Sequence, residues 1–254
     1  MQVPHVEKHA PGTFCWIELA TTDHSATKEF YSELFGWIIR EFPMGPKDFY
    51  TTFEIDGRDV AAVYTLRPER QARGVPAHWS LYVAVENADT AADRARGLGA
   101  KVIAEPFDVY DVGRMAVVQD PTGAVFPGGR RNATTASVLR AFSCVADLST
   151  SDQDGASRFY EQLFKWRIGK EEEDPSHNYY HLFNHDEFLG GIPGAPPHWQ
   201  IYLLVSDCDG VATKAKCLGA KLYMPPMKIE DIGRMAVMAD PQSAAFGIFE
   251  AARQ

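Results

Sequence analysis

The stretch FCWIELATTDHSATKEFYSELFGW (14–37) decides the fold, because it occurs a second time as SCVADLSTSDQDGASRFYEQLFKW (143–166). Tyr31 falls on Tyr160 in this alignment, an offset of 129 residues. Both copies alternate large and polar residues as a half-buried strand does, and then space their apolar residues as an amphipathic helix does. A pattern that recurs in this way indicates a duplicated structural unit.

A second duplicated stretch follows in each half of the chain. HWSLYVAVENADTAADRARGLGAK (78–101) matches HWQIYLLVSDCDGVATKAKCLGAK (198–221) at an offset of 120. The change of offset places a loop difference near RPERQARGVPA (67–77), a polar stretch with Pro and Gly that is typical of a linker. The duplication predicts two homologous domains, 12–128 and 141–250, with a linker over 129–140.

Each half predicts the order strand, helix and three strands, twice over. Asp23 is placed to cap the first helix at its N-terminus, and Gly36 is placed to end it. Asp56-Gly57 between two apolar stretches is a strong hairpin signal. A second helix is expected to begin near Asn87 and to end at Leu98-Gly99. The sequence therefore predicts an α+β protein of four βαβββ units.

Composition limits the classes of partner. The 254 residues are 45% hydrophobic and 23% charged, as in ordinary globular proteins, and the formal net charge is −9. Such an acidic chain gains no affinity from phosphate charges, so we expect neither nucleic acid nor a membrane as a partner. The four cysteines have no CxxC spacing, and no apolar run reaches the roughly 20 residues of a membrane span. We expect a soluble, cytoplasmic protein with reduced thiols.

The paired βαβββ units, with FYxxLFGW at the first helix and GRxAVxxDP before the last hairpin, resemble the vicinal oxygen chelate superfamily. That superfamily includes glyoxalase I, bleomycin-resistance proteins and extradiol dioxygenases. The resemblance covers nearly the whole chain. It implies two glyoxalase-like domains, each a curled mixed sheet around one cleft with helices outside. It also implies that four cleft-facing side chains per domain, on the first and last strands of the two units, commonly hold a divalent metal.

The residues at those positions do not suit a metal, which needs His, Gln, Glu or Asp there. Alignment on the helix tyrosines gives one set of four positions in each half. The first set is Trp16, Ala62, Ser80 and Pro127, and the second set is Val145, Gly191, Gln200 and Gly247. A single Gln among eight positions predicts that both sites have lost the metal of the family, so we expect neither a metal nor another cofactor.

One polar pattern is present in both halves: Glu18 corresponds to Asp147, and His78 corresponds to His198. Each acid lies two residues after a ligand position and each histidine two residues before one, so all should face the cleft. If the acid and the histidine lie opposite each other, Glu18–His78 and Asp147–His198 form carboxylate–imidazole pairs. Such pairs are candidate catalytic groups, or buried hydrogen bonds that tie the units together.

Four further residues are predicted to line the ligand clefts: Trp16, Ser80, Val145 and Gln200. Trp16 could stack on a flat ligand but reduces the volume of the first cleft. Val145 and the pair Gly190-Gly191 leave more room, which predicts that the larger cavity lies in the second half. His177, His181 and His185 are spaced four apart, but YYHLF favours a strand there rather than a metal site.

Three functions are compatible with these patterns. The leading hypothesis is a metal-independent, small-molecule-binding protein of the glyoxalase and bleomycin-resistance type. The second is a metal-dependent lyase, isomerase or dioxygenase of the same superfamily. The third is a non-catalytic interaction or stress protein that uses the fold as a scaffold.

Overall fold

The structure is a computed structural model that describes residues 9–46, 48–110, 112–131, 145–169, 179–193 and 196–252. The strands of the first half are β1 (Phe14–Thr21), β2 (Ile38–Pro43), β3 (Phe49–Ile55), β4 (Arg58–Thr65), β5 (His78–Ala84), β6 (Lys101–Val109), β7 (Gly113–Gln119) and β8 (Val125–Arg131). Those of the second half are β9 (Val145–Ser149), β10 (Arg167–Gly169), β11 (Tyr180–Asn184), β12 (Glu187–Ile192), β13 (His198–Leu204), β14 (Lys221–Ile229), β15 (Gly233–Ala239) and β16 (Ala245–Ala251). The helices are α1 (His24–Phe35), α2 (Pro68–Ala72), α3 (Ala88–Gly97), α4 (Gln153–Phe164) and α5 (Cys208–Cys217).

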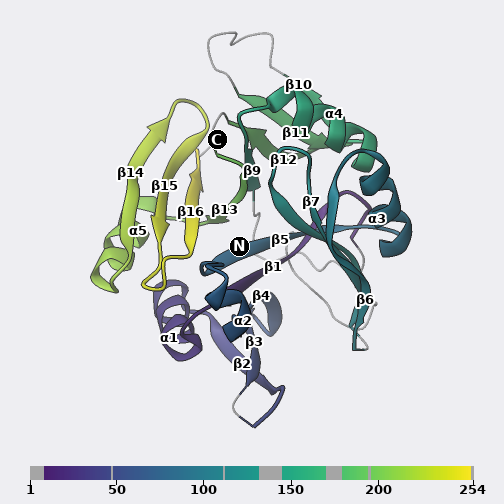
Figure 1. The fold of residues 1–254 in the computed structure, drawn as a ribbon. Coiled ribbons are helices and arrows are strands. Elements are labelled where there is room, and N and C mark those ends of the chain that lie inside the picture. Colours follow the sequence, from purple (N-terminus) through teal and green to yellow (C-terminus); the bar gives the residue numbers. More distant parts are fainter. Residues whose placement is uncertain are drawn as a thin grey trace.

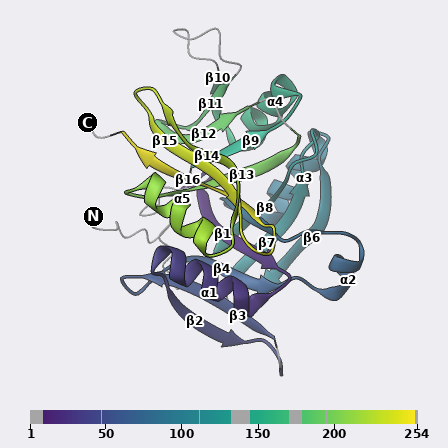
Figure 2. The same ribbon diagram turned by 90° about the vertical axis from the view of Figure 1, so that its left-hand side faces the viewer.

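The first half forms one mixed, eight-stranded sheet in the order β2-β3-β4-β1-β5-β8-β7-β6. Its centre is the antiparallel pair β1 and β5, and each of these strands has a parallel neighbour on its other side, β4 or β8. In the second half, a five-stranded sheet has the order β14-β15-β16-β13-β9, and the three-stranded sheet β10-β11-β12 lies beside β9. The predicted α+β class is confirmed, and Figures 1 and 2 show the helices on the outside of the sheets.

The helix caps and the hairpin turn that the sequence predicts are present in the structure. The Asp23 side chain accepts a hydrogen bond from the Ala26 backbone N–H, which caps α1, and Gly36 ends the helix with φ 70°. Asn87 caps α3 in the same way. Asp56 and Gly57 have φ values of 51° and 73°, the left-handed backbone that a tight hairpin turn requires. The loop expected over 67–77 contains the short helix α2.

Two buried tyrosines connect the halves of the chain. The Tyr160 hydroxyl on α4 donates to Oδ2 of Asp120, in the turn after β7, at 2.8 Å. The Tyr31 hydroxyl on α1 donates to Oδ2 of Asp240, in the turn after β15, at 3.2 Å. Burial raises the pKa of both phenols well above the ordinary value, so both hydroxyls keep their protons. The repeated FY and DP motifs therefore hold the two halves together.

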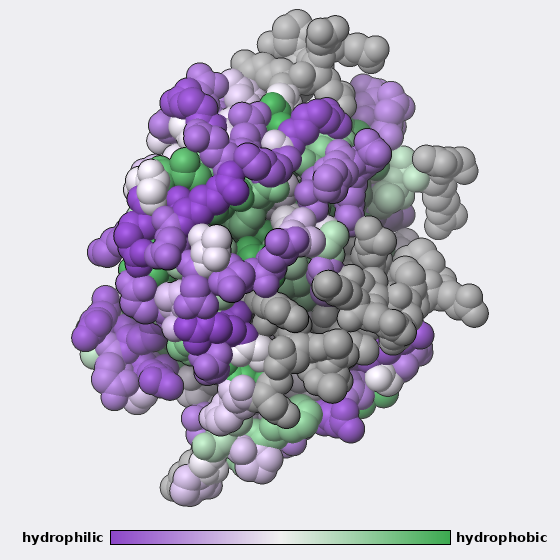
Figure 3. Space-filling view, turned by 90° about the vertical axis from the view of Figure 1, so that its right-hand side faces the viewer, coloured by the Kyte–Doolittle hydropathy of each residue, from purple (hydrophilic) through white to green (hydrophobic). Residues whose placement is uncertain are grey.

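The helices also pack in two pairs, each with one helix from either half of the chain. α1 packs against α5, and α3 packs against α4, at the two sides of the molecule in Figure 1. The face that carries α3 and β6 is covered mainly by hydrophilic residues, with hydrophobic ones scattered between them (Figure 3). Within the described ranges, no helix has the length and apolar character that crossing a bilayer demands.

Candidate functional site

A cavity of about 390 Å³ lies in the first half, within the range of small-molecule sites. β1 contributes Trp16 and Glu18, β3 contributes Tyr50 and Thr52, and β5 contributes Tyr82. The remaining lining residues come from β2 and the residue after it, from β4, from the β6–β7 hairpin and from β8: Phe42, Met44, Asp59, Val109, Tyr110, Val112, Gly113, Arg114, Met115 and Gly129, with Cys15 at an irregular point of β1. The wall is largely apolar and aromatic, with few polar groups.

Glu18 is held in the cavity wall by a tyrosine. The Tyr82 hydroxyl donates a hydrogen bond to Oε2 of Glu18 at 2.5 Å. Burial, followed by the Glu18 charge, raises the pKa of Tyr82 well above its ordinary value, so the phenol remains a donor at physiological pH. The same two causes raise the pKa of Tyr64 to about 12. Glu18 thus presents its carboxylate in a fixed position at the edge of the cavity.

The predicted pairing of Glu18 with His78 is wrong. In the β1–β5 ladder Glu18 lies opposite Ser80, Trp16 lies opposite Tyr82, and His78 lies opposite Ala20. The side chains share a face, as expected, but the register places the histidine one pair further along the strand. The His78 ring instead bonds through Nδ1 to the Pro76 carbonyl oxygen at 2.8 Å.

The second predicted pair fails for the same reason. Asp147 lies opposite Gln200 in the β9–β13 ladder, and His198 lies opposite Ser149. Nδ1 of His198 bonds to the Pro196 carbonyl oxygen at 2.8 Å, so both histidines repeat one local turn contact. The recurrence of HW in the sequence therefore reflects the start of a strand, and the acid has another partner.

That partner is a tyrosine in both halves. Asp147 is the counterpart of Glu18, and it accepts hydrogen bonds from Tyr202, the counterpart of Tyr82, from the Tyr179 hydroxyl at 2.7 Å and from the Gly191 N–H at 3.0 Å. Burial nevertheless raises the pKa of Asp147 above its ordinary value. The recurrence of tyrosine at an offset of 120 is the sequence signal for this acid–tyrosine pair, in place of the acid–histidine pair expected above.

We expect Asp147→Asn to change how stability depends on pH. The pKa of this carboxyl group is higher in the folded chain than its ordinary value of 3.8. Such a group stabilises the fold most at a pH below the unfolded pKa, and this contribution is lost as the pH rises through the folded pKa. The unfolding free energy of the wild type should therefore fall relative to that of the variant as pH rises from about 4. Urea unfolding between pH 4 and 8 measures the difference, and a difference independent of pH would contradict the assignment.

The second half does not have the space predicted beside Gly190 and Gly191. A Cβ atom on Gly191 would lie 2.0 Å from Cζ of Tyr179, and one on Gly190 would lie 1.9 Å from the carbonyl oxygen of Ala146. The space beside the two glycines is already filled by the Tyr179 ring and by the backbone of Ala146, so the expectation that the glycines enlarge the second cleft is wrong. Tyr179 fills this place and seals Asp147 beneath it.

The residues at the metal positions of the family do not fit a divalent metal. In the first half these positions carry an indole, a methyl group, a hydroxyl and a proline ring: Trp16, Ala62, Ser80 and Pro127. In the second half the Tyr179 ring lies over Gly191, and a Cβ atom on Gly247 would lie 2.2 Å from Cδ1 of Tyr202. Within the described part of the chain, no three His, Cys, Asp or Glu side chains gather in a way that could hold a metal ion.

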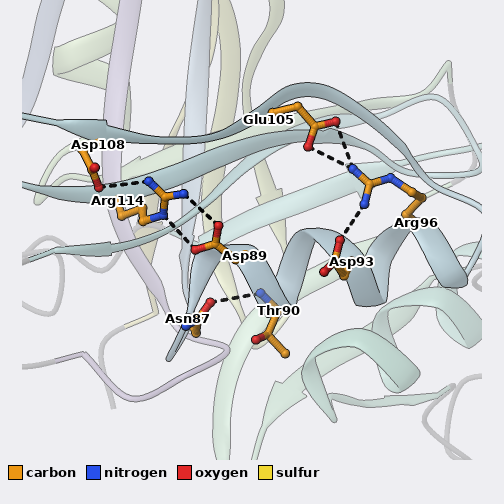
Figure 4. Close-up of polar contacts among 8 residues, drawn as sticks. All are labelled: Asn87, Asp89, Thr90, Asp93, Arg96, Glu105, Asp108 and Arg114. Atoms are coloured by element: carbon orange, nitrogen blue, oxygen red, sulfur yellow. Dashed lines mark hydrogen bonds and ion pairs between the residues drawn. The ribbon is translucent and has the colours of Figure 1, made fainter.

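Two other sequence patterns remain: the histidines spaced four residues apart, and the arginine of the repeated GR motif. His181 lies on β11 and His185 lies in the following turn with φ 55°, while His177 falls outside the described residues. Arg114 contacts Asp89, on the first turn of α3, through two nitrogen atoms at 2.8 Å, and Asp108 at 3.1 Å (Figure 4). Arg234 contacts Asp209, on the first turn of α5, at 2.7 Å. The repeated arginine thus connects a strand to a helix in both halves.

Comparison with known proteins agrees with this fold. The family model described as the glyoxalase/bleomycin resistance protein/dioxygenase superfamily matches residues 13–126. The "Putative glyoxylase CFP32" of Mycobacterium tuberculosis is 34% identical over 261 residues, which cover 99% of this chain and 100% of that protein. The "Anthracycline biosynthesis protein DnrV" of Streptomyces peucetius is 31% identical over 273 residues, which cover 96% of this chain and 94% of that protein.

Two solved structures share the fold at low sequence identity. The Mn(II)-bound glyoxalase from Novosphingobium aromaticivorans has a TM-score of 0.65 at 12% identity and covers 95% of this chain and 83% of its own. The 2,2',3-trihydroxybiphenyl 1,2-dioxygenase from Sphingomonas wittichii has a TM-score of 0.67 at 12% identity and covers 95% of this chain and 91% of its own. At these identities the likeness concerns the fold alone.

Proposed function

Because the chain belongs to the glyoxalase/bleomycin resistance protein/dioxygenase superfamily, we propose that it binds a flat, largely apolar small molecule in the cavity of its first half, without a metal. The observation that carries the proposal is the cavity itself: Trp16 lies in its wall at the position where the family commonly has a metal ligand. An indole there, with only 3% of Trp16 exposed, provides an apolar contact at the cavity wall and no electron-donating ligand atom.

The chemistry of the walls supports an aromatic ligand. Trp16, Phe42, Tyr50, Tyr82 and Tyr110 all line the cavity, and aromatic side chains favour flat ring systems through stacked and edge-to-face contacts. Two relatives carry names of anthracycline biosynthesis, and anthracyclines contain fused, flat rings. Glu18, fixed by Tyr82, adds a carboxylate to the edge of this cavity.

The two halves have different roles in this proposal. We propose domains at 12–128 and 141–250, as the duplication predicts, although β8 continues to Arg131 and so extends into the predicted linker. In the second domain, Asp147 is a structural group that Tyr179 covers. Neither His78 nor His198 is assigned a catalytic role, because each bonds to a nearby backbone carbonyl.

Calorimetric titration with 2-naphthol, a flat aromatic probe, tests this function. We expect binding with a dissociation constant in the micromolar range or weaker, as is usual for a ligand this small. Prior dialysis against EDTA should leave the affinity unchanged. Loss of binding after EDTA, with recovery on addition of about one equivalent of Fe, Mn, Ni or Zn, would favour the metal-dependent alternative.

A further inference from the structure

Two polar atoms in the cavity wall are buried without a hydrogen-bond partner among the residues that the structure describes. They are Oγ1 of Thr52, a residue only 4% exposed, and Oδ1 of Asp59. Buried polar groups are nearly always paired, because an unpaired one loses its bonds to water and gains nothing in return. Two such atoms in one cavity therefore need an explanation.

The strand geometry directs both side chains to the cavity side of the sheet. Thr52 on β3 lies opposite Ala62 on β4, which in turn lies opposite Glu18 on β1. An irregularity follows in the β3–β4 pairing, and it brings Asp59 opposite Glu54, two residues beyond Thr52 on the same face. Both Thr52 and Asp59 consequently line the same cavity as Glu18.

The fold does not require a hydroxyl and a carboxylate at these two positions. The pairing of β11 with β12 repeats that of β3 with β4: His181 lies opposite Gly191, and Phe183 lies opposite Phe188. At the offset of 129, His181 replaces Thr52 and Phe188 replaces Asp59. Those two rings contact each other with centroids 5.7 Å apart. An imidazole and a phenyl ring thus stand where the first half has a hydroxyl and a carboxylate, so the combination of Thr52 and Asp59 is particular to the half that contains the cavity.

The donor and acceptor capacities of the two groups select a ligand chemistry. A threonine hydroxyl both donates and accepts, whereas a carboxylate only accepts. A ligand hydroxyl can accept from Thr52 and donate to Asp59, but an ammonium group can only donate and leaves the threonine proton unused. An anionic ligand would face the carboxylates of Asp59 and Glu18, and the guanidinium of Arg114 is already held by two aspartates.

We propose that Thr52 and Asp59 form a subsite for hydroxyl groups on the edge of an uncharged aromatic ligand. This inference rests on the proposed function, because it names the class of molecule that the same cavity binds. The apolar and aromatic walls hold the ring system, and the two unpaired groups select molecules that carry a phenolic or alcoholic hydroxyl.

The test compares probes of one shape against paired variants. Calorimetric titrations use 2-naphthol, the similarly shaped 2-methylnaphthalene, which lacks the hydroxyl, and the anion 2-naphthoate. We expect the wild type to bind 2-naphthol about tenfold more tightly than 2-methylnaphthalene, the usual effect of one or two hydrogen bonds, and 2-naphthoate most weakly. Thr52→Val and Asp59→Leu should each remove most of this preference, because each weakens the binding of 2-naphthol and neither removes a group that 2-methylnaphthalene can bond to.

Two further measurements make the result specific. Thr51→Val removes a hydroxyl from the same strand on the opposite face, where it bonds to His24, and should leave the preference for 2-naphthol intact. Since Thr52→Val removes an unpaired buried group, it should also raise the melting temperature of the ligand-free protein by about 2 to 4 °C. Equal binding of 2-naphthol and 2-methylnaphthalene in the wild type and both variants would overturn the subsite alone. Absence of binding for every probe would overturn the proposed function and the subsite together.

Discussion

Replacing Asp120 by alanine should lower the free energy of unfolding by about 3 to 5 kcal/mol, the upper end of single-residue effects. Oδ1 of Asp120 accepts from the backbone N–H groups of Thr122, Gly123 and Ala124 at 2.8, 2.8 and 3.0 Å. Oδ2 accepts from Tyr160 of the other half. Alanine would remove this acceptor from the N–H groups of Thr122 and Ala124 and from the Tyr160 hydroxyl, in a site where Asp120 itself is only 3% exposed. The Gly123 N–H would keep only its 3.1 Å bond to the backbone carbonyl oxygen of residue 120. Equilibrium unfolding in urea measures the change.

A milder variant separates the turn from the contact between the halves. Tyr160→Phe keeps the ring, which stacks on Trp166 at 5.3 Å, and removes only the hydroxyl that Asp120 and Trp199 share. We expect about 1 to 2 kcal/mol of destabilisation from this loss. If Asp120→Ala were no more destabilising than Tyr160→Phe, the hydrogen bonds within the turn would not contribute as described.

Thr52→Trp should weaken binding of 2-naphthol by more than about a hundredfold, because an indole at this wall position occupies the volume that the ligand needs. The threonine is only 4% exposed but lines the cavity, so the larger side chain would extend into it. The cavity accepts the added volume, and the melting temperature should change little. Calorimetry and thermal unfolding on the same sample measure both quantities.

The matched control is His181→Trp, at the corresponding position of the second half. Because the proposed ligand site belongs to the first half, this substitution should leave the affinity for 2-naphthol unchanged. Loss of binding in His181→Trp together with normal binding in Thr52→Trp would place the ligand in the second half of the molecule and contradict the proposal.

The sequence predicted those features that depend on neighbouring residues or on the duplication. The helix cap at Asp23, the hairpin at Asp56-Gly57 and the α+β class all follow from local conformational preferences and from the repeated order of elements. Alternation along β1 also placed Glu18 on the cavity face, since a strand exposes every second residue to one side.

The pairing of side chains between strands could not be predicted in this way. Alternation defines the face of Glu18 but not its partner, and the actual register sets it opposite Ser80 with Tyr82 within hydrogen-bond distance. Likewise, Gly191 indicated empty space only as long as no distant residue filled it. Tyr179, directly before β11, fills that space, and the sequence of β12 gives no sign of this contact.

We propose that the first half binds an uncharged aromatic ligand directly on its side chains, without a metal. A crystal structure of the protein with 2-naphthol, with anomalous data to detect any metal, tests it most directly. We expect one naphthol per chain, with its ring against Trp16 and its hydroxyl at Thr52 and Asp59. A ligand in the second half, or one bound through a metal ion beside Glu18, would contradict it.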